Sequence, residues 1–126
     1  MSLSHTRVHA TLPASDFERA KAFYAEKLSL SPESETPGGA FYEMAEGSRF
    51  VLFPSSGQAS GTATQMGFTV SNIEEEVADL KSKGVIFEEY EFPGFDTVNN
   101  ITTLPVLKNA FFKDSEGNLL GMVEFL

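Results

Sequence analysis

Hydrophobic and polar residues alternate near the start of the chain and then change to a helical spacing. Val8, Ala10 and Leu12 fall on one side of an expected strand, and His9 and Thr11 fall on the other. This alternation predicts a strand with one apolar face and one polar face, and it places His9 on the polar face.

A helix is predicted directly after this strand. Ser15 and Glu18 have the spacing of a capping box, in which each side chain satisfies a free amide at the start of a helix. The apolar residues that follow recur at helical intervals and form a single stripe: Phe17, Ala20, Tyr24 and Leu28. We expect this stripe to cover the apolar face of a sheet.

The same pattern recurs 56 residues later, from Thr64 to Gly84. Apolar and other residues again alternate along a predicted strand, with Met66, Phe68 and Val70 on one side and Gln65, Gly67 and Thr69 on the other. Ser71 and Glu74 repeat the spacing of the capping box, and Gly84 is the expected helix stop. The constant offset indicates two similar halves, in which His9 aligns with Gln65.

Strands are expected after each helix. Each half ends in an apolar-rich hairpin around a glycine turn, "AFYEMA" with "SRFVLF" in the first and "NAFFKD" with "NLLGMVEF" in the second. A further strand is predicted over "VIFEEYEF", residues 85–92, and its counterpart in the first half near "LSLSPES". Each half is therefore predicted to be β-α-β-β-β.

Two connecting segments differ from the rest in composition. "PSSGQASGTA", residues 54–63, is rich in Ser and Gly and is predicted to join the halves. "PGFDTVNNITTLPVL", residues 93–107, is predicted to be a long irregular loop that serves as a lid or binding loop. We expect one domain over residues 1–126, with a first module at about 5–54, a linker at about 55–63 and a second module at about 64–126.

Composition excludes several classes of function. The chain has 9 basic and 18 acidic residues and a formal charge of -9, which disfavours nucleic acid and anionic membranes as partners. It has no cysteine, so disulfides and thiolate chemistry are excluded. No apolar stretch approaches a spanning helix and the first residues do not resemble a secretory signal, so a cytoplasmic protein is expected.

Two segments, "HATLPASDFERAKAFYAEKLSL" and "AFFKDSEGNLLGMVEF", together with the two predicted halves, resemble the vicinal oxygen chelate superfamily. This superfamily includes glyoxalase I, extradiol dioxygenases and bleomycin resistance proteins. The resemblance implies an α+β fold in which two βαβββ modules form a curved mixed sheet, a cup with the helices on its outer face. It also implies a homodimer with pockets at or near the interface.

The resemblance assigns four positions where metal-binding members carry their ligands, usually His, Glu, His or Gln, and Glu. They correspond here to His9, to Val51 or Leu52, to Gln65 and to Gly121. Only His9 is a strong ligand, and an aliphatic residue and a glycine offer no donor. We therefore expect no divalent metal and no other cofactor.

The preferred interpretation is a metal-independent small-molecule binding protein with its ligand in the cup. The candidate ligand-binding residues are His9, Thr11, Gln65, Thr69, Asn100 and Thr103. An acidic surface and an aromatic cup would suit a cationic ligand. Two alternatives stay open: a glyoxalase-like or dioxygenase-related enzyme with His9 as acid or base, and a non-catalytic regulatory module.

Overall fold

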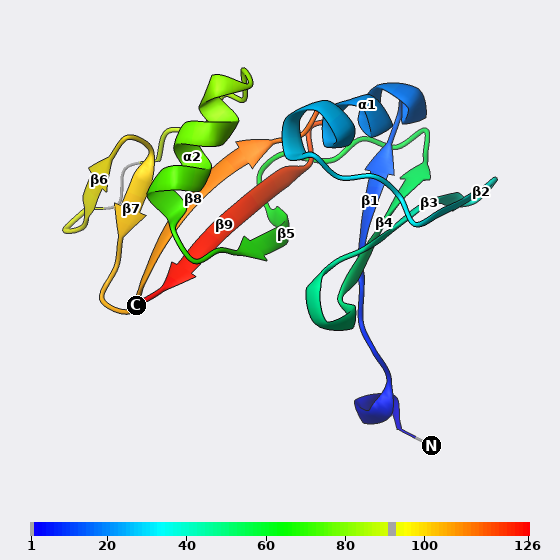
Figure 1. Cartoon of the computed structure of the whole chain (residues 1–126), viewed down its shortest axis with the longest axis horizontal. Helices are drawn as coiled ribbons and strands as arrows, with labels where there is room; N and C mark the ends of the chain where they lie inside the picture. Colours follow the sequence, from blue (N-terminus) through cyan, green and yellow to red (C-terminus); the bar gives the residue numbers. More distant parts are fainter. Residues whose placement is uncertain (1, 91–92) are drawn as a thin grey trace.

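The computed structural model describes residues 2–90 and 93–126 and arranges them in two halves, each with one helix and one sheet (Figure 1). The first half, called module 1, has the sheet order β1-β4-β3-β2. Its elements are β1 (Ala10–Ala14), α1 (Phe17–Leu28), β2 (Ser34–Thr36), β3 (Gly39–Glu43), the 3-10 turn η2 (Ala45–Gly47) and β4 (Arg49–Pro54). Another 3-10 turn, η1 (Leu3–His5), precedes them.

The second half, called module 2, repeats this topology and adds one edge strand. Its sheet order is β5-β9-β8-β7-β6. Its elements are β5 (Thr64–Thr69), α2 (Ile73–Ser82), β6 (Asp96–Val98), β7 (Ile101–Thr103), β8 (Leu107–Lys113) and β9 (Leu119–Phe125). In each module the first strand runs parallel to the last and the other pairs are antiparallel.

The predicted fold class, α+β with two βαβββ modules and mixed sheets, is confirmed. The two sheets remain open and separate, because no ladder of hydrogen bonds among the described residues joins β1 to β5. These two edge strands nevertheless lie within contact distance of each other. The region where they meet is called the seam.

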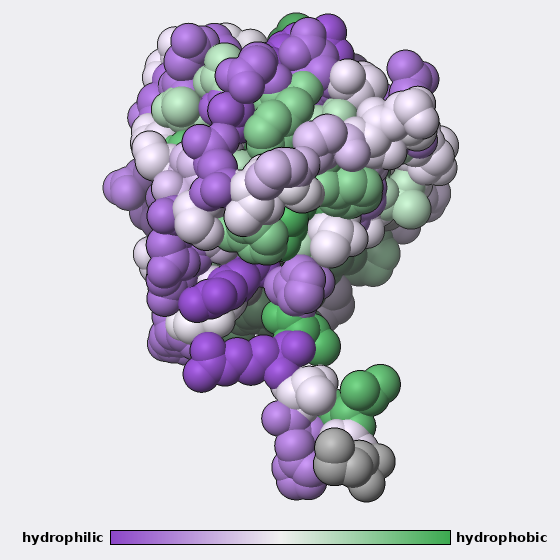
Figure 2. Space-filling view, turned by 90° about the vertical axis from the view of Figure 1, so that its right-hand side faces the viewer, coloured by the Kyte–Doolittle hydropathy of each residue, from purple (hydrophilic) through white to green (hydrophobic). Residues whose placement is uncertain are grey.

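The first strand begins later than the alternation predicted. β1 starts at Ala10, and Val8 is 88% exposed rather than packed on the sheet. Residues 2–9 extend from the body as an arm, which Figure 2 shows from the side. The alternation fails here because β4 begins only at Arg49, beside His9, so the described chain before His9 has no strand of this sheet beside it.

Both helices are capped one residue later than predicted. The Asp16 side chain accepts a hydrogen bond from the amide of Arg19, and the Asn72 side chain accepts one from the amide of Glu75. The capping boxes at Ser15 and Ser71 are therefore wrong. The offset of 56 is kept, since Asp16 and Asn72 are equivalent positions with the same acceptor chemistry.

The predicted strand over residues 85–92 is wrong in the part that the structure describes. Val85 and Phe87 are buried, but Phe87 makes only an isolated bridge to Phe112 of β8. The alternation reflects burial of two side chains in the core without a paired ladder. Residues 91 and 92 lie outside the described residues.

The predicted irregular loop over residues 93–107 is also wrong, because β6 and β7 form a hairpin within it. The turn is Asn99-Asn100, and both residues have positive φ, 53° and 68°. Asparagine tolerates this left-handed conformation, and the two-residue turn matches the twist of paired strands. Thr97 and Thr102 add a hydroxyl contact of 3.0 Å between the strands.

Substitution of Asn99 tests whether this conformation holds the hairpin. We expect Asn99→Val to lower the free energy of unfolding by about 1–2 kcal/mol, because a β-branched residue is strained at positive φ. Asn99→Gly should be neutral or slightly stabilising, since glycine adopts this conformation freely. Urea unfolding of both variants measures the difference in stability. Equal stability of the two would contradict the left-handed conformation of Asn99 in the turn.

In each module the helix covers one face of the sheet. Tyr24 of α1 packs against Tyr42 and Phe50, with ring centroids 5.8 and 5.6 Å away. At the far end of the helices, Lys27 donates to the carbonyl of Lys83 and Lys83 donates to the hydroxyl of Ser29. This reciprocal contact joins the two helix ends.

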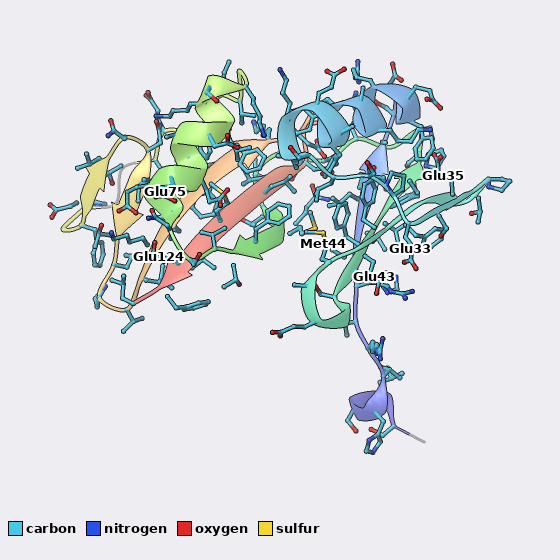
Figure 3. The ribbon with its side chains drawn as sticks, in the orientation of Figure 1. Glu33, Glu35, Glu43, Met44, Glu75 and Glu124 are labelled. Carbon is cyan, nitrogen blue, oxygen red and sulfur yellow. The ribbon has the colours of Figure 1, made fainter. Side chains whose placement is uncertain are left out.

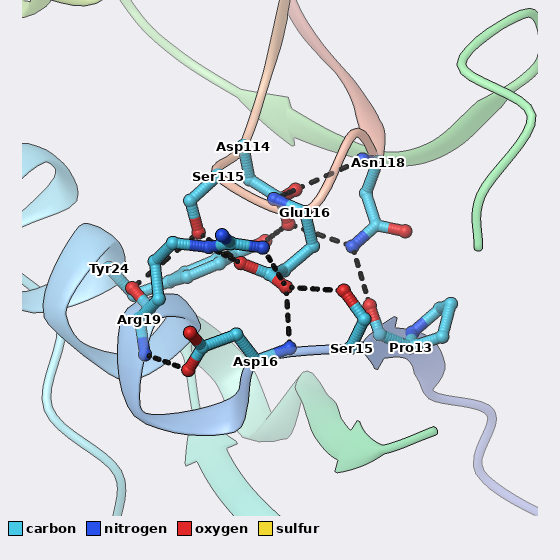
Figure 4. A network of polar contacts seen from close by, with 9 residues as sticks. All are labelled: Pro13, Ser15, Asp16, Arg19, Tyr24, Asp114, Ser115, Glu116 and Asn118. Carbon is cyan, nitrogen blue, oxygen red and sulfur yellow. Dashed lines mark hydrogen bonds and ion pairs between the residues drawn. The ribbon is translucent and has the colours of Figure 1, made fainter. Parts of the chain in front are cut away.

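The turn between β8 and β9 holds module 2 to the start of α1 (Figure 4). The Tyr24 hydroxyl donates to Asp114 over 2.7 Å, and Asn118 donates to the carbonyl of Pro13 over 3.0 Å. Asp114 and Asn118 are buried and also bond to each other over 2.8 Å. Burial and the Asp114 charge raise the pKa of Tyr24, which keeps its hydroxyl a donor.

Glu116 completes this turn network. Its side chain is 1% exposed and forms an ion pair with Arg19 over 2.8 Å. It also accepts hydrogen bonds from the Asp16 amide and from Ser115. Burial raises the pKa of this carboxyl, but the bonds from Arg19, Asp16 and Ser115 outweigh burial and lower the pKa to about 2. A charged contact therefore reinforces the junction between α1 of module 1 and the β8–β9 turn of module 2.

Candidate functional site

A pocket of about 760 Å³ lies at the seam. Its walls come from the end of the arm, the loop around η2, the start of β4, and β5. The lining residues are Val8, His9, Ala10, Met44, Ala45, Glu46, Ser48, Arg49, Phe50, Met66, Gly67, Phe68 and Thr69. We call this the seam pocket, and its size is within the range of small-molecule sites.

The seam pocket combines apolar and charged groups. Met44, Met66 and Phe68 are half-buried and supply apolar surface. Figure 3 shows Met44 between the two modules. His9 and Arg49 stand next to each other, since each immediately precedes one partner of the first β1–β4 pair, Ala10 with Phe50. The arrangement provides an apolar wall with hydrogen-bond donors at its edge.

A smaller pocket of about 370 Å³ lies beside the seam pocket on the helix side. Met44, Phe68 and Thr69 line both pockets. Its charged residues are Glu76, Asp79 and Lys83, of which Asp79 and Lys83 form an ion pair over 3.2 Å. This pocket therefore continues the apolar wall, and its basic group, Lys83, is already paired.

The structure brings together only some of the predicted ligand-binding residues. His9 and Thr69 both line the seam pocket. Thr11 lies on β1, two residues after His9. Gln65 is half-buried at an irregularity in β5. A role for any of these four in binding a ligand stays a prediction.

Asn100 and Thr103 lie elsewhere. They belong to the β6–β7 hairpin, and β9 and β8 separate β7 from β5. The side chain of Asn100 donates to the carbonyl of Glu88 over 3.4 Å, and Thr103 is exposed at the end of β7. The hairpin holds these residues away from His9.

The register of the strands identifies the residue at the second metal-ligand position. Val51 pairs with Thr11 on the face that points away from α1, whereas Leu52 is fully buried on the opposite face. Val51 is therefore the equivalent residue, and it has no donor atom. Among the described residues, no group of three or more His, Asp or Glu side chains is placed to hold an ion.

The fourth ligand position is covered by an aromatic ring. Phe111 pairs with Gly121 across β8 and β9, and a Cβ atom at Gly121 would lie only 3.2 Å from the Phe111 ring. Tyr90 packs edge-on against the same ring at a centroid distance of 5.6 Å. Aromatic packing thus occupies the space that a ligating carboxylate would need, and the residues present do not fit the family's metal.

Nearby carboxylates do not replace the missing ligands. Figure 3 shows Glu43 in module 1 and Glu124 in module 2, far from each other. Glu124 accepts a hydrogen bond from the amide of Ile73 over 2.9 Å and so supports the start of α2. Sequence reasoning missed Arg49 and Met44, because they reach the seam pocket only through the loop at η2.

Comparisons with known proteins agree with this architecture. UcmS2 is similar over 94% of this chain and 98% of its own, with 21% identity and a TM-score of 0.75. A glyoxalase/bleomycin resistance protein/dioxygenase from Alicyclobacillus acidocaldarius is 20% identical, with 100% and 96% of the chains covered and a TM-score of 0.71. TnmS3, an antibiotic binding protein from Streptomyces sp. CB03234, is 20% identical, with 96% and 98% covered and a TM-score of 0.65. At these identities the likeness shows the fold alone.

A comparison with curated proteins found no significant match. None of the described helices is long and apolar enough to cross a membrane. A family model does match, over residues 6–122, which is nearly the whole chain. The protein therefore belongs to the Glyoxalase/Bleomycin resistance protein/Dioxygenase superfamily.

Proposed function

We propose that this protein binds a small molecule without a metal ion, and that the ligand sits in the seam pocket beside His9. The observation that carries the proposal is the contrast between the seam pocket and the positions where metal-binding relatives hold their ion. The seam pocket is open and has apolar and polar lining, whereas the metal-ligand positions carry Val51 and a glycine packed under Phe111. A site without carboxylate donors suits binding better than metal-assisted chemistry.

The similarity in fold to TnmS3, whose description is an antibiotic binding protein, supports the same proposal. We further propose that the protein acts in the cytoplasm as a homodimer. Two apolar residues of the arm, Leu3 and Val8, are 85% and 88% exposed. A second copy of the chain would cover such apolar surface.

A second candidate function is an enzyme that uses His9 as an acid or base. It is favoured by one observation: His9 is exposed in the seam pocket and makes no ion pair or side-chain hydrogen bond among the described residues. A free imidazole at a pocket edge is suited to proton transfer.

Metal analysis and an activity assay distinguish these functions. We expect protein purified without chelator to contain far less than one equivalent of divalent metal, and to be inactive toward the methylglyoxal–glutathione adduct after divalent ions are added. Near-stoichiometric metal with turnover would contradict the proposal. Turnover without metal that is lost in His9→Ala but kept in His5→Ala would favour the enzyme. His5 is the matched control because it lies in the exposed arm, outside the pocket.

A further inference from the structure

The lining of the seam pocket is less acidic than the chain as a whole. The chain carries a formal charge of -9, whereas the pocket is lined by one arginine, Arg49, and one carboxylate, Glu46. Arg7 lies over the adjacent loop, with its Nη1 atom 3.6 Å from the place that a Cβ at Gly47 would take. Two arginine side chains therefore lie at or beside one edge of the site.

Unlike the other basic residues, Arg7 and Arg49 have no side-chain partner in the part of the chain that the structure describes. Five of the nine Lys and Arg side chains form ion pairs: Arg19, Lys21, Lys83, Lys108 and Lys113. Lys27 and Lys81 donate to backbone carbonyls. Within the described residues, Arg7 and Arg49 are the two that have neither an ion pair nor a side-chain hydrogen bond. A guanidinium presents a planar set of donors that matches a carboxylate.

Two carboxylates lie in the neighbourhood of Arg49. Glu46 lines the pocket, and Glu43 is opposite Arg49 across β3 and β4. Neither comes within ion-pair distance, 4.0 Å, of Arg49. The Arg49 donors therefore remain available to a ligand.

We infer that the seam pocket takes an amphipathic carboxylate, with the apolar body against Met66 and Phe68 and the carboxylate on Arg49. This inference rests on the proposed binding function and names its ligand class. It reverses the expectation of a cationic ligand that the overall charge favoured. The local groups decide the sign, because charges farther away than about 8 Å are largely screened at physiological salt.

Three probes with one apolar body test the sign of the ligand charge. They are 1-naphthoate, neutral 1-naphthamide and cationic 1-naphthylmethylammonium, each titrated calorimetrically at neutral pH and about 0.15 M ionic strength. We expect 1-naphthoate to bind about tenfold more tightly than either of the others, because a hydrogen-bonded charge pair adds to the shared apolar contact.

Variants assign this preference to the pocket. Arg49→Gln should weaken 1-naphthoate about tenfold or more and change 1-naphthamide by about twofold at most. Glu46→Gln, which removes a neighbouring carboxylate, should strengthen 1-naphthoate by about twofold to fivefold. Lys81→Gln is the control, because it makes the same change of charge at an exposed position on α2 outside the pocket.

Each other outcome overturns the inference. If the three probes bind equally, or the ammonium binds most tightly, the pocket binds small molecules but not as a carboxylate site, and the proposed function survives. If Arg49→Gln and Lys81→Gln weaken 1-naphthoate alike, the effect comes from overall charge. If none of the probes binds at millimolar concentration, the inference falls together with the pocket's proposed role.

Discussion

Replacing Glu116 by glutamine is expected to lower the free energy of unfolding by about 2–4 kcal/mol at neutral pH. The carboxylate is 1% exposed and accepts from the Arg19 guanidinium, the Asp16 amide and Ser115. Glutamine keeps one acceptor oxygen but turns an amide donor toward these donors. The variant thus loses the ion pair and leaves a buried donor unsatisfied.

The loss of stability in Glu116→Gln should depend on pH, and the pKa of Glu116 determines the direction. The pKa of Glu116 is about 2 in the folded chain and ordinarily 4.5. Its stabilising effect is therefore complete above pH 4.5 and disappears as the pH falls toward 2. The difference between parent and variant should shrink over the same interval, as urea unfolding at several pH values will measure.

Glu26→Gln is the matched control for Glu116→Gln. Glu26 lies exposed on α1 and has no ion pair among the described residues, so its replacement should change stability by less than about 0.5 kcal/mol. A loss in Glu116→Gln that is no larger than the loss in Glu26→Gln would show that the turn network does not hold the modules together.

Gly121→Glu should lower the free energy of unfolding by about 3–5 kcal/mol, although it restores the residue type that metal-binding relatives carry. The new Cβ would be 3.2 Å from the Phe111 ring and 3.5 Å from Thr64, so the carboxylate would be enclosed without a partner. Adding Phe111→Ala to the same chain should recover about 1–2 kcal/mol by opening space and admitting water. Urea unfolding of the single and double variants measures this coupling.

Gly67→Glu supplies the comparison for this experiment. Gly67 pairs with Gly121 across β5 and β9, but it is exposed, and the atom nearest to its Cβ would be a carbonyl oxygen 3.8 Å away. We expect a change of about 1 kcal/mol or less there. A Gly121→Glu variant as stable as Gly67→Glu would mean that Phe111 yields easily and that the position is open to a ligand.

The duplicated pattern explains how much of the fold was predictable. The constant offset of 56 residues predicted both helices and the first and last strands of each half, because the apolar pattern repeats wherever a helix covers a sheet. Segments outside the repeat were not predictable in this way. The hairpin at Asn99-Asn100 has three-residue strands, too short for a periodic signal, and its two asparagines were the only local sign of the turn.

The candidate site was less predictable than the fold. Alternation and the repeat selected His9 and Thr69, which line one pocket, but they could not select Arg49 or Met44. Those side chains reach the pocket because the loop at η2 folds beside β5, a contact between segments far apart in the sequence. The hydrogen bonds of the β8–β9 turn likewise join Tyr24 to Asp114, which are 90 residues apart in the sequence, and no local pattern encodes that contact.

The late start of β1 has a consequence for the range of ligands. Arg49 belongs to a strand with neighbours on both sides, whereas His9 lies one residue before the ladder between β1 and β4 begins. The two neighbouring side chains are thus held differently, Arg49 by paired strands and His9 by the chain that leads into β1. Because strand pairing constrains Arg49 more than the chain before β1 constrains His9, selectivity should follow the ligand's head group more closely than its width.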